Sequence, residues 1–189
     1  MSQSPSLSGR LLVAMPGIGD PRFEHAVILI CAHGPDHAMG LRLDRPVSGV
    51  DLKAVLDRLD LAVPETAPER QILAGGPVER ERGFVLHTDD WVSPESSLAF
   101  GDGLAMTGTR DALVAMADVE AGPDRALLVL GYAGWGEGQL EDELAENVWL
   151  MSDADLDLIF DADHDTKWAR ALARIGVDAG RLSAQGGRA

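Results

Sequence analysis

Cysteine and histidine side chains lie close together in one stretch of the sequence, at Cys31, His33 and His37. In a strand, Cys31 and His33 would point the same way, and His37 could fold back after a turn, so three ligands for zinc or copper could meet there. No second cysteine pair and no His-Glu-x-x-His sequence accompanies them. Because Cys31 lies in an apolar run, burial should raise the pKa of its thiol and make it a poor nucleophile. A buried cysteine beside polar loop histidines is the favoured interpretation, and we predict no metal site and no cofactor.

Candidates for nucleophilic or acid–base catalysis are equally sparse. No serine occupies a Gly-x-Ser-x-Gly sequence. The two lysines, Lys53 and Lys167, are not expected in apolar pockets that would lower their pKa. His33 and His87 could each act as a base in the neighbourhood of Arg82, which keeps an enzyme of unknown reaction open as an alternative. We therefore assign no catalytic residue.

Phosphate and calcium sites are also disfavoured. The glycine-rich stretch 134–138 follows a predicted strand and opens a helix, but the helix begins with Glu141-Asp142-Glu143, which would repel a phosphate. Aspartates alternate over 153–157 and again over 161–165. Neither run has the glycine at the sixth position and the glutamate at the twelfth that an EF-hand loop requires. Helix caps and solvated carboxylates explain these aspartates better.

The elements that must position these residues are mostly strands in the first half of the chain, with irregularly spaced helices. The run 26–32 is continuously apolar and rich in β-branched residues, as in a strand buried on both faces. Asp51 can cap an amphipathic helix, and Gly176 stands where the last helix should end. The predicted strands span 10–15, 26–32, 38–43, 71–74, 83–87, 97–100, 104–106 and 126–132, and the predicted helices 52–59, 110–117, 139–147 and 165–175.

This pattern predicts an α+β fold, an α/β-type single domain with a mixed, largely antiparallel β-sheet flanked by helices. We place the domain at residues 10–178. The small, polar segments 1–9 and 179–189 are expected to be disordered tails.

The charge and hydropathy of the chain disfavour some classes of protein function. The 189 residues include 31 acidic and 16 basic side chains, a formal net charge of −15, and the stretch 137–165 contains 11 acids and no Lys or Arg. Nucleic-acid binding depends on Lys and Arg at phosphates, so no direct nucleic-acid partner is expected. No apolar run approaches the roughly 20 residues of a membrane span, and we expect a cytoplasmic protein without a membrane partner. The acidic surface either aids solubility or docks a basic partner.

Several longer motifs occur in an order that none of this chemistry explains. They are Met15-Pro16 with Asp20-Pro21 and Phe23, Cys31-Ala32-His33, Ala38-Met39-Gly40, Arg45-Pro46, Gly75-Gly76-Pro77-Val78, Arg82-Gly83-Phe84-Val85-Leu86-His87, Leu130-Gly131-Tyr132-Ala133-Gly134-Trp135, Gly138-Gln139-Leu140-Glu141, Asn147 and Trp149-Leu150. Through these motifs, over residues 9–178, the chain resembles the YqgE/AlgH family of small bacterial proteins, also catalogued as UPF0301 and DUF179.

The resemblance implies a compact domain with a mixed sheet flanked by helices. It also brings the label of a transcriptional regulator of alginate synthesis, which one branch carries. The chain departs from the family pattern at Glu24-His25-Ala26, where relatives often have basic residues and a hydroxyl, and at Arg42 and Asp44, which replace an apolar residue and an asparagine. These changes argue against anion binding near Phe23. Since no helix carries a basic face, a direct DNA-binding regulator is the least favoured interpretation.

The glycine-rich motifs suggest turns that converge on one pocket or groove. Its aromatic rings would make amphipathic contacts with a ligand, and its arginine would bind an anion through two N–H groups. Its amide and carboxylate side chains would orient the ligand through polar contacts. In the structural alternative, Trp135 belongs to the core, Arg82 pairs with Glu141 or another acid, and the glycines only allow tight turns. The nine residues of this predicted pocket are Gly75, Gly76, Pro77, Arg82, His87, Tyr132, Trp135, Gln139 and Glu141.

The leading interpretation is a non-enzymatic cytosolic binding or regulatory protein that acts through a protein or small-molecule partner. The alternative is an enzyme that uses the His33, His87 and Arg82 neighbourhood. We expect a monomer or a weak oligomer.

Overall fold

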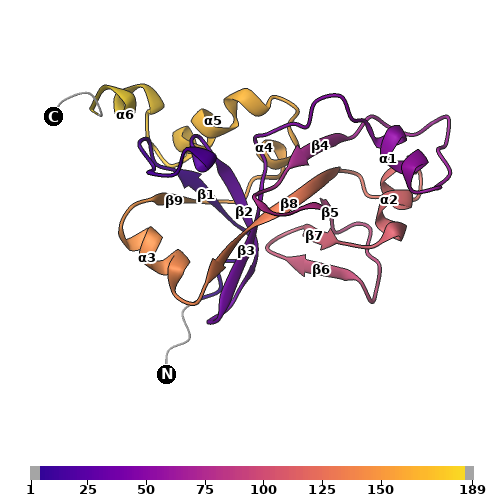
Figure 1. The fold of residues 1–189 in the computed structure, drawn as a ribbon, viewed down its shortest axis with the longest axis horizontal. Coiled ribbons are helices and arrows are strands. Elements are labelled where there is room, and N and C mark those ends of the chain that lie inside the picture. The colour runs from indigo at the N-terminus through magenta and orange to yellow at the C-terminus, as the bar shows by residue number, and fades with distance from the viewer. Residues whose placement is uncertain (1–4, 186–189) are drawn as a thin grey trace. The chain divides into compact units, whose positions relative to one another are not determined.

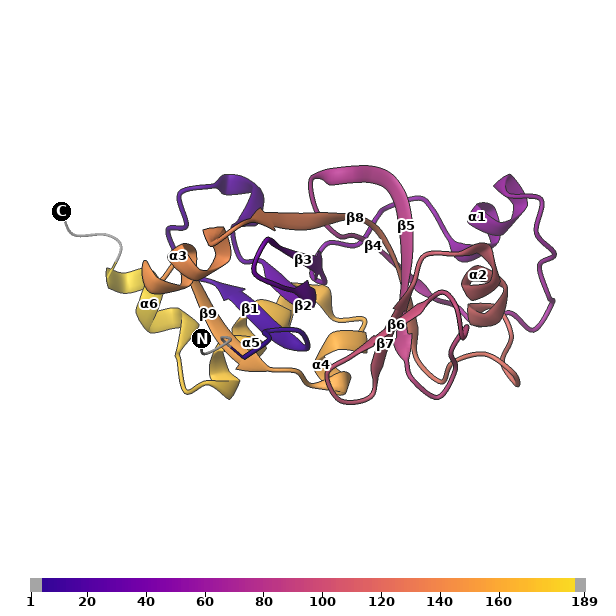
Figure 2. The same ribbon diagram turned by 90° about the horizontal axis from the view of Figure 1, so that it is seen from below.

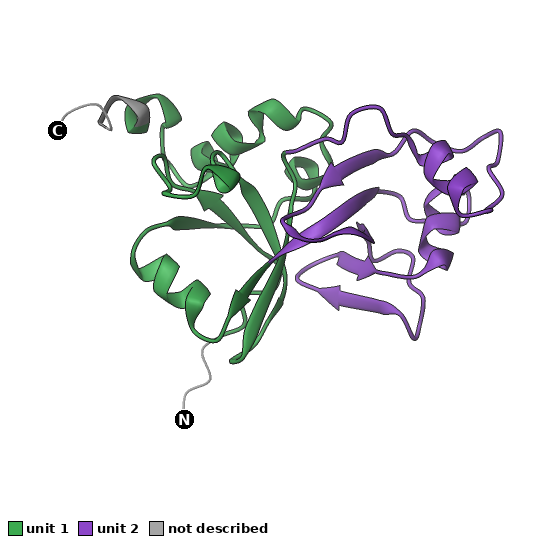
Figure 3. Cartoon of the chain, viewed as in Figure 1, with its two compact units in different colours: residues 1–44, 134–189 green, residues 45–133 purple. Residues whose placement is uncertain are grey.

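The computed structural model describes residues 5–185, and it divides into two compact units (Figures 1 and 3). Unit 1 combines residues 1–44 with 134–189, and unit 2 is Arg45–Ala133. Unit 2 is therefore an insertion in the sequence of unit 1. The strand β8 (Ala126–Gly136) begins in unit 2 and ends in unit 1.

Unit 1 contains the N-terminal strands and the C-terminal helices (Figure 1). Its strands are hydrogen-bonded in the order β8, β3, β2, β1, β9, and β1 is antiparallel to both β2 and β9. Helix α5 lies along β1 and β2 in both views (Figures 1 and 2). The elements are β1 (Arg10–Ala14), η1 (Pro21–Phe23), β2 (Val27–His33), β3 (His37–Arg42), α3 (Gln139–Ala145), β9 (Trp149–Asp153), α4 (Leu156–Phe160), η2 (His164–Thr166), α5 (Lys167–Arg174) and α6 (Ala179–Gln185).

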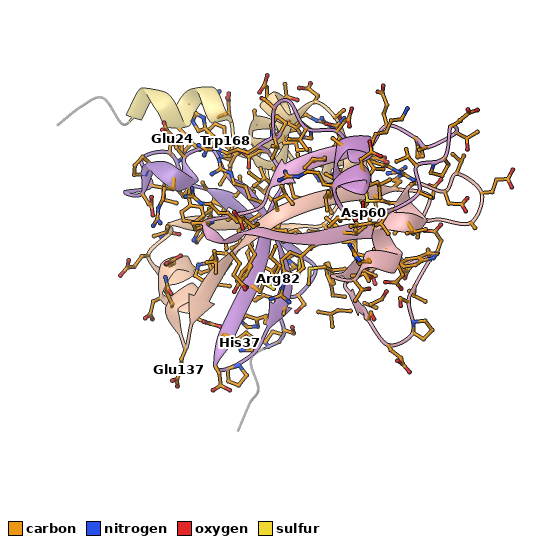
Figure 4. The ribbon with its side chains drawn as sticks, turned by 45° about the vertical axis from the view of Figure 1, so that its right-hand side comes forward. Glu24, His37, Asp60, Arg82, Glu137 and Trp168 are labelled. Atoms are coloured by element: carbon orange, nitrogen blue, oxygen red, sulfur yellow. The ribbon has the colours of Figure 1, made fainter. Side chains whose placement is uncertain are left out.

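The core of unit 1 is built on β1 and β2. The apolar run of β2 is buried on both faces, as the sequence predicts, and Leu11 to Ala14 of β1 are also fully buried. Burying one such aliphatic side chain stabilises the fold by about 1.5–3 kcal/mol. Trp168 fixes α5 to this core: its indole Nε1 donates a hydrogen bond to the Ala14 carbonyl oxygen at 2.8 Å, and its ring stacks on His25 at 4.1 Å. Trp168 is labelled in Figure 4.

Unit 2 has its own sheet and core. Here β8 pairs antiparallel with β5 and parallel with β4, and β7 lies between β5 and β6. The helices cover a core that includes Leu56, Met116 and Leu128. Asp51 caps α1 as predicted, since its side chain accepts the Ala54 N–H at 2.8 Å. The elements are α1 (Leu52–Arg58), β4 (Gln71–Ala74), β5 (Val78–Thr88), β6 (Ser97–Phe100), β7 (Leu104–Thr107), α2 (Arg110–Met116) and the first part of β8.

The structure confirms the predicted α+β class with a mixed, largely antiparallel sheet. Strands β4 and β8 form a parallel pair in this sheet. Helix α6 covers part of the segment 179–189 that was expected to be a tail, and residues 1–4 and 186–189 of the two expected tails lie outside the described residues. None of the described helices has the length and apolar character needed to cross a membrane.

Candidate functional site

The glycines of two sequence motifs meet in unit 2 where two backbones cross. A Cβ atom on Gly76 would lie 2.1 Å from the Tyr132 carbonyl carbon, and one on Gly131 would lie 2.7 Å from the Gly76 oxygen. Gly131 also has a φ of +75°, a conformation that glycine adopts far more readily than other residues. The segment from Gly75 onward therefore packs directly on the β8 backbone, and the Gly75 N–H donates to the Leu130 oxygen at 2.7 Å. The close packing at this crossing explains why both motifs contain glycine.

Immediately after the crossing, β5 bulges away from β8. Val78 pairs with Tyr132 and Gly83 pairs with Leu130, so residues 79–82 stand opposite Gly131 alone. All four of these residues are exposed, and we call them the β5 bulge. Glu79 within it has a φ of +44°, in the left-handed region that a residue with a Cβ rarely occupies. Strained backbone of this kind is found preferentially at functional sites.

Arg82 is held at the end of the β5 bulge. Its guanidinium lies 5.0 Å from the centroid of the Phe84 ring, and its Nη1 donates to Glu79 Oε2 at 3.2 Å. The Phe84 ring in turn meets the Tyr132 ring edge-on at 6.1 Å. Arg82 therefore pairs with Glu79, and 58% of its side chain remains exposed. Figure 4 labels Arg82 on this part of the chain.

His87 is the predicted pocket residue most deeply enclosed in unit 2. The residue is fully buried, and its ring meets Trp91 edge-on at 5.2 Å. Its Nδ1 lies 2.9 Å from the Thr88 carbonyl oxygen and its Nε2 lies 2.8 Å from Thr107 Oγ1. Burial lowers the pKa of His87, although the Thr88 carbonyl and the carboxylate of Asp90 oppose that effect. Near neutral pH the imidazole is therefore uncharged.

Two pocket residues of unit 1, Trp135 and Gln139, contact Glu143 in α3. Trp135 and Trp149 both donate their indole N–H to Glu143 Oε2, at 2.9 and 2.6 Å. Gln139 donates to the other carboxylate oxygen at 2.9 Å and accepts the Gly136 N–H at 3.1 Å. Trp135 is only 5% exposed. Sequence reasoning did not single out Glu143, because its partners lie on two different strands.

Glu141 faces His33 in unit 1. Glu141 Oε1 lies 2.7 Å from His33 Nε2, and His33 Nδ1 accepts the Leu7 N–H at 3.3 Å. Because Nδ1 accepts, Nε2 carries the proton and donates it to the carboxylate. This hydrogen bond lowers the pKa of Glu141. Glu141 therefore pairs with His33, while Arg82 pairs with Glu79.

The predicted pocket thus divides between the units. Three members, Trp135, Gln139 and Glu141, belong to unit 1. That all nine residues border one shared pocket remains a prediction. The structure describes the contacts of these residues within each unit. The six members in unit 2 are Gly75, Gly76, Pro77, Arg82, His87 and Tyr132.

Two of the residues that depart from the family pattern, Arg42 and Asp44, pair with each other. Arg42 is 3% exposed, and its Nε and Nη2 donate to the two carboxylate oxygens of Asp44 at 2.9 and 2.8 Å. The guanidinium also donates to the carbonyl oxygens of Arg22 and Glu24, while Asp44 accepts the Val27 N–H at 3.1 Å. Bidentate pairing of this kind is the strongest geometry for an arginine and a carboxylate. The arginine on β3 and the aspartate after it therefore form one buried ion pair.

The expectation for Lys167 was wrong. Its side chain is fully buried, and Nζ donates to the carbonyl oxygens of Leu43 and Ile159 at 3.0 and 2.9 Å. Burial disfavours the ammonium form and lowers the pKa to about 8, although the carboxylates of Asp161 and Asp44 oppose the shift. Together Arg42, Asp44 and Lys167 form what we call the ionic network of unit 1. No local sequence signal marks this lysine, because its acceptors are backbone oxygens from distant elements.

The cysteine and histidine stretch does not form a metal cluster. Cys31 is buried, which raises the pKa of its thiol, and His33 is turned to Glu141. Among residues 5–185 the structure brings together no group of three or more His, Cys, Asp or Glu side chains that could hold a metal ion.

Fold and site together define a class of small α+β protein in which one unit is inserted into another and a charged bulge is supported by glycines. Residues 11–180 match the family described as AlgH-like, DUF179. The chain belongs to this family. It is 59% identical over 183 residues to a UPF0301 protein of Caulobacter vibrioides, covering 97% of this chain and 94% of that one. It is 46% identical over 195 residues to one of Bradyrhizobium diazoefficiens, covering 100% of this chain and 91% of that one.

Two solved structures are similar. The solution structure of the AlgH protein from Pseudomonas aeruginosa has a TM-score of 0.77 and 41% identity, and the match covers 100% of both chains. The crystal structure of a Corynebacterium diphtheriae protein has a TM-score of 0.71 and 21% identity, covering 92% of this chain and 89% of that one. The second likeness concerns the fold alone.

Proposed function

We propose that this protein is a binding protein of the cytoplasm that recognises another protein through the β5 bulge. The observation that carries the proposal is the exposed Arg82 side chain, held over Phe84 on a backbone crossing that only glycines permit. Arginine and aromatic residues are enriched in protein interfaces, and they dominate the binding energy there.

The bulge is also pre-organised. The close crossing at Gly76 and Gly131 leaves the backbone little freedom, so little conformational entropy is lost on binding. Val78, 36% exposed, adds an apolar neighbour to the charged residues. A rigid, exposed surface with an arginine anchor and an apolar neighbour suits a folded protein partner.

Charge supports a protein rather than a nucleic acid as the partner. Residues 79–82 alternate Glu, Arg, Glu, Arg and therefore carry no net charge. The rest of the chain, with its formal net charge of −15, would repel a polyanion. An alternating pattern instead favours a partner with matched alternating charges, which fixes orientation more than it adds affinity.

The test is site-specific photo-crosslinking in cells. A photoreactive residue at position 81 should capture one defined protein, whereas the same residue at position 119, where Val119 is 61% exposed, should not. The captured protein is then purified and titrated against wild type, Arg82→Ala and the matched control Arg58→Ala, an exposed arginine of α1 in the same unit.

We expect Arg82→Ala to weaken binding by at least about tenfold, as for an interface anchor. Arg58→Ala should bind like the wild type. Equal capture at positions 81 and 119, or equal affinities of the two arginine variants, would refute the proposal.

A further inference from the structure

A continuous chain of hydrogen bonds runs from Ser97 to His87 inside unit 2. Ser97 Oγ lies 2.6 Å from Thr107 Oγ1, which lies 2.8 Å from His87 Nε2. The Ser93 N–H donates to Ser97 Oγ at 2.8 Å. Ser97 is the first residue of β6, and Thr107, the last residue of β7, is paired with it across the two strands. We call Ser97, Thr107 and His87 the hydroxyl chain.

The direction of every proton in the hydroxyl chain follows from its two ends. The Thr88 carbonyl can only accept, so His87 Nδ1 carries its proton and Nε2 of the neutral ring is an acceptor. Thr107 must then donate to Nε2, and Ser97 must donate to Thr107. All hydroxyl protons therefore point toward the histidine, as they must if the histidine is to remove the proton of Ser97.

The exposure and charge of these residues suit the same role. Thr107 is 1% exposed and His87 is fully buried, whereas Ser97 is partly exposed and is the end of the chain that solvent reaches. The carboxylates of Asp90 and Asp89 act on His87 and favour its protonated form. Nearby negative charge stabilises the imidazolium that would form during proton transfer.

We propose that Ser97 is a nucleophile, activated by His87 through Thr107, and that it reacts with activated carboxylic esters. Ser97 Oγ forms a bond to the carbonyl carbon as its proton moves to Thr107 and the proton of Thr107 moves to His87 Nε2. The bond between that carbon and the leaving alcohol oxygen breaks, and the protons return along the same path to the leaving group. Water then hydrolyses the acyl-serine and releases the carboxylic acid. Ser97 is the catalytic residue, and Thr107 and His87 deliver and hold the proton.

The test uses the whole purified chain with a fluorophosphonate probe and with p-nitrophenyl acetate. Peptide mass spectrometry should place the fluorophosphonate on Ser97, and p-nitrophenol release should be lost in Ser97→Ala. The labelling rate should rise with pH to a half-maximum below pH 6.5, the ordinary histidine value, because burial holds the pKa of His87 down.

Three variants separate the relay from a merely structural role. Thr107→Val removes the relay hydroxyl and should slow labelling by about 100-fold, a typical contribution of general base catalysis. Thr107→Ser keeps a hydroxyl and should retain most of the rate. Ser96→Ala, at the neighbouring serine, should label like the wild type.

Absence of labelling in the wild type would overturn the proposal. So would labelling shared between Ser96 and Ser97, or a rate that does not depend on pH. If Thr107→Val does not fold by circular dichroism, the pH profile of the wild type and the Thr107→Ser variant decides the question. None of these measurements involves the β5 bulge, so their failure leaves the proposed binding function standing.

Discussion

The ionic network of unit 1 and the hydroxyl chain of unit 2 are both largely buried, yet they differ in whether their hydrogen-bonding groups can transfer a proton. In the ionic network, Arg42 and Lys167 donate to carboxylate or carbonyl oxygens, which carry no proton of their own to donate onward. In the hydroxyl chain, Thr107 and Ser97 each donate and accept, and the chain ends at a base. One arrangement fixes charge in place, and the other can transfer it.

The two networks also differ in what their loss should cost. Removing one partner from a buried ion pair leaves an uncompensated charge, whereas removing one neutral hydroxyl leaves a weaker, neutral defect. Stability measurements should therefore be dominated by unit 1, and reactivity by unit 2.

Arg42→Met should cause the largest loss of stability. The variant leaves the Asp44 carboxylate buried without its guanidinium, and it leaves the carbonyl oxygens of Arg22 and Glu24 without their donor. We expect the free energy of unfolding to fall by about 3–5 kcal/mol. Urea denaturation followed by circular dichroism at pH 7 measures this loss. Arg22→Met removes an exposed arginine from the same unit and is the control, with a far smaller effect. Equal losses in the two variants would contradict the assignment of a buried pair.

Comparison of Lys167→Met with the wild type should reveal a pH-dependent contribution of this lysine to the free energy of unfolding. Between about pH 8 and pH 10.5 the folded chain has lost the Lys167 proton while the unfolded chain keeps it. Since the unfolded state then binds more protons, the unfolding free energy of the wild type, relative to the variant, should rise with pH, by about 2–3 kcal/mol over this range. Nearby charged groups such as Asp161, Arg170 and His164 are common to both proteins and largely cancel in the difference. A difference that is flat from pH 8 to pH 10.5 would show that the lysine is not buried as described.

Thr107→Val should destabilise the protein by only about 1–2 kcal/mol, because the hydrogen bonds it removes join neutral groups. The loss should be the same at pH 7 and pH 9, since His87 is uncharged at both. Thermal unfolding of this variant beside Thr66→Val, an exposed threonine of the same unit, measures the effect. A loss as large as that of Arg42→Met would mean that the contrast between the networks is false.

Glu79→Gln should have the smallest effect. Glu79 and Arg82 form an exposed ion pair at 3.2 Å, and pairs of this kind contribute about 0–0.5 kcal/mol. The variant removes an exposed ion pair, whereas Arg42→Met removes the buried pair between Arg42 and Asp44. Urea denaturation should give a curve nearly superimposable on that of the wild type, and a shift above about 1 kcal/mol would indicate that the pair also holds the β5 bulge.

Local patterns predicted much of the fold. The apolar run of β2, the Asp51 cap of α1 and the turn between β6 and β7 all depend on neighbouring residues, and each was found near its predicted place. The strand β9 was missed because it lies in an acidic stretch and no turn signal links it to a neighbouring strand. Its partner β1 comes from the other end of the chain, where Ala14 pairs with Trp149.

The candidate sites were predicted less well, for a physical reason. The glycines of the motifs were recognised as turn residues, but the need for them arises where Gly76 and Gly131 bring two backbones together. The burial of Lys167 depends on carbonyl oxygens of Leu43 and Ile159, and a backbone oxygen leaves no mark in a sequence. Ser97 likewise becomes notable only through Thr107, its partner across the hairpin.

The insertion of unit 2 within unit 1 has a consequence for biosynthesis. The ribosome completes β1, β2 and β3 before it makes Arg45–Ala133, and their partners β8, β9 and α5 emerge only afterwards. At about 5–20 residues per second, this leaves the apolar β2 waiting for several seconds. The apolar β2 therefore lacks the strands and the helix that complete unit 1 for as long as unit 2 is being translated.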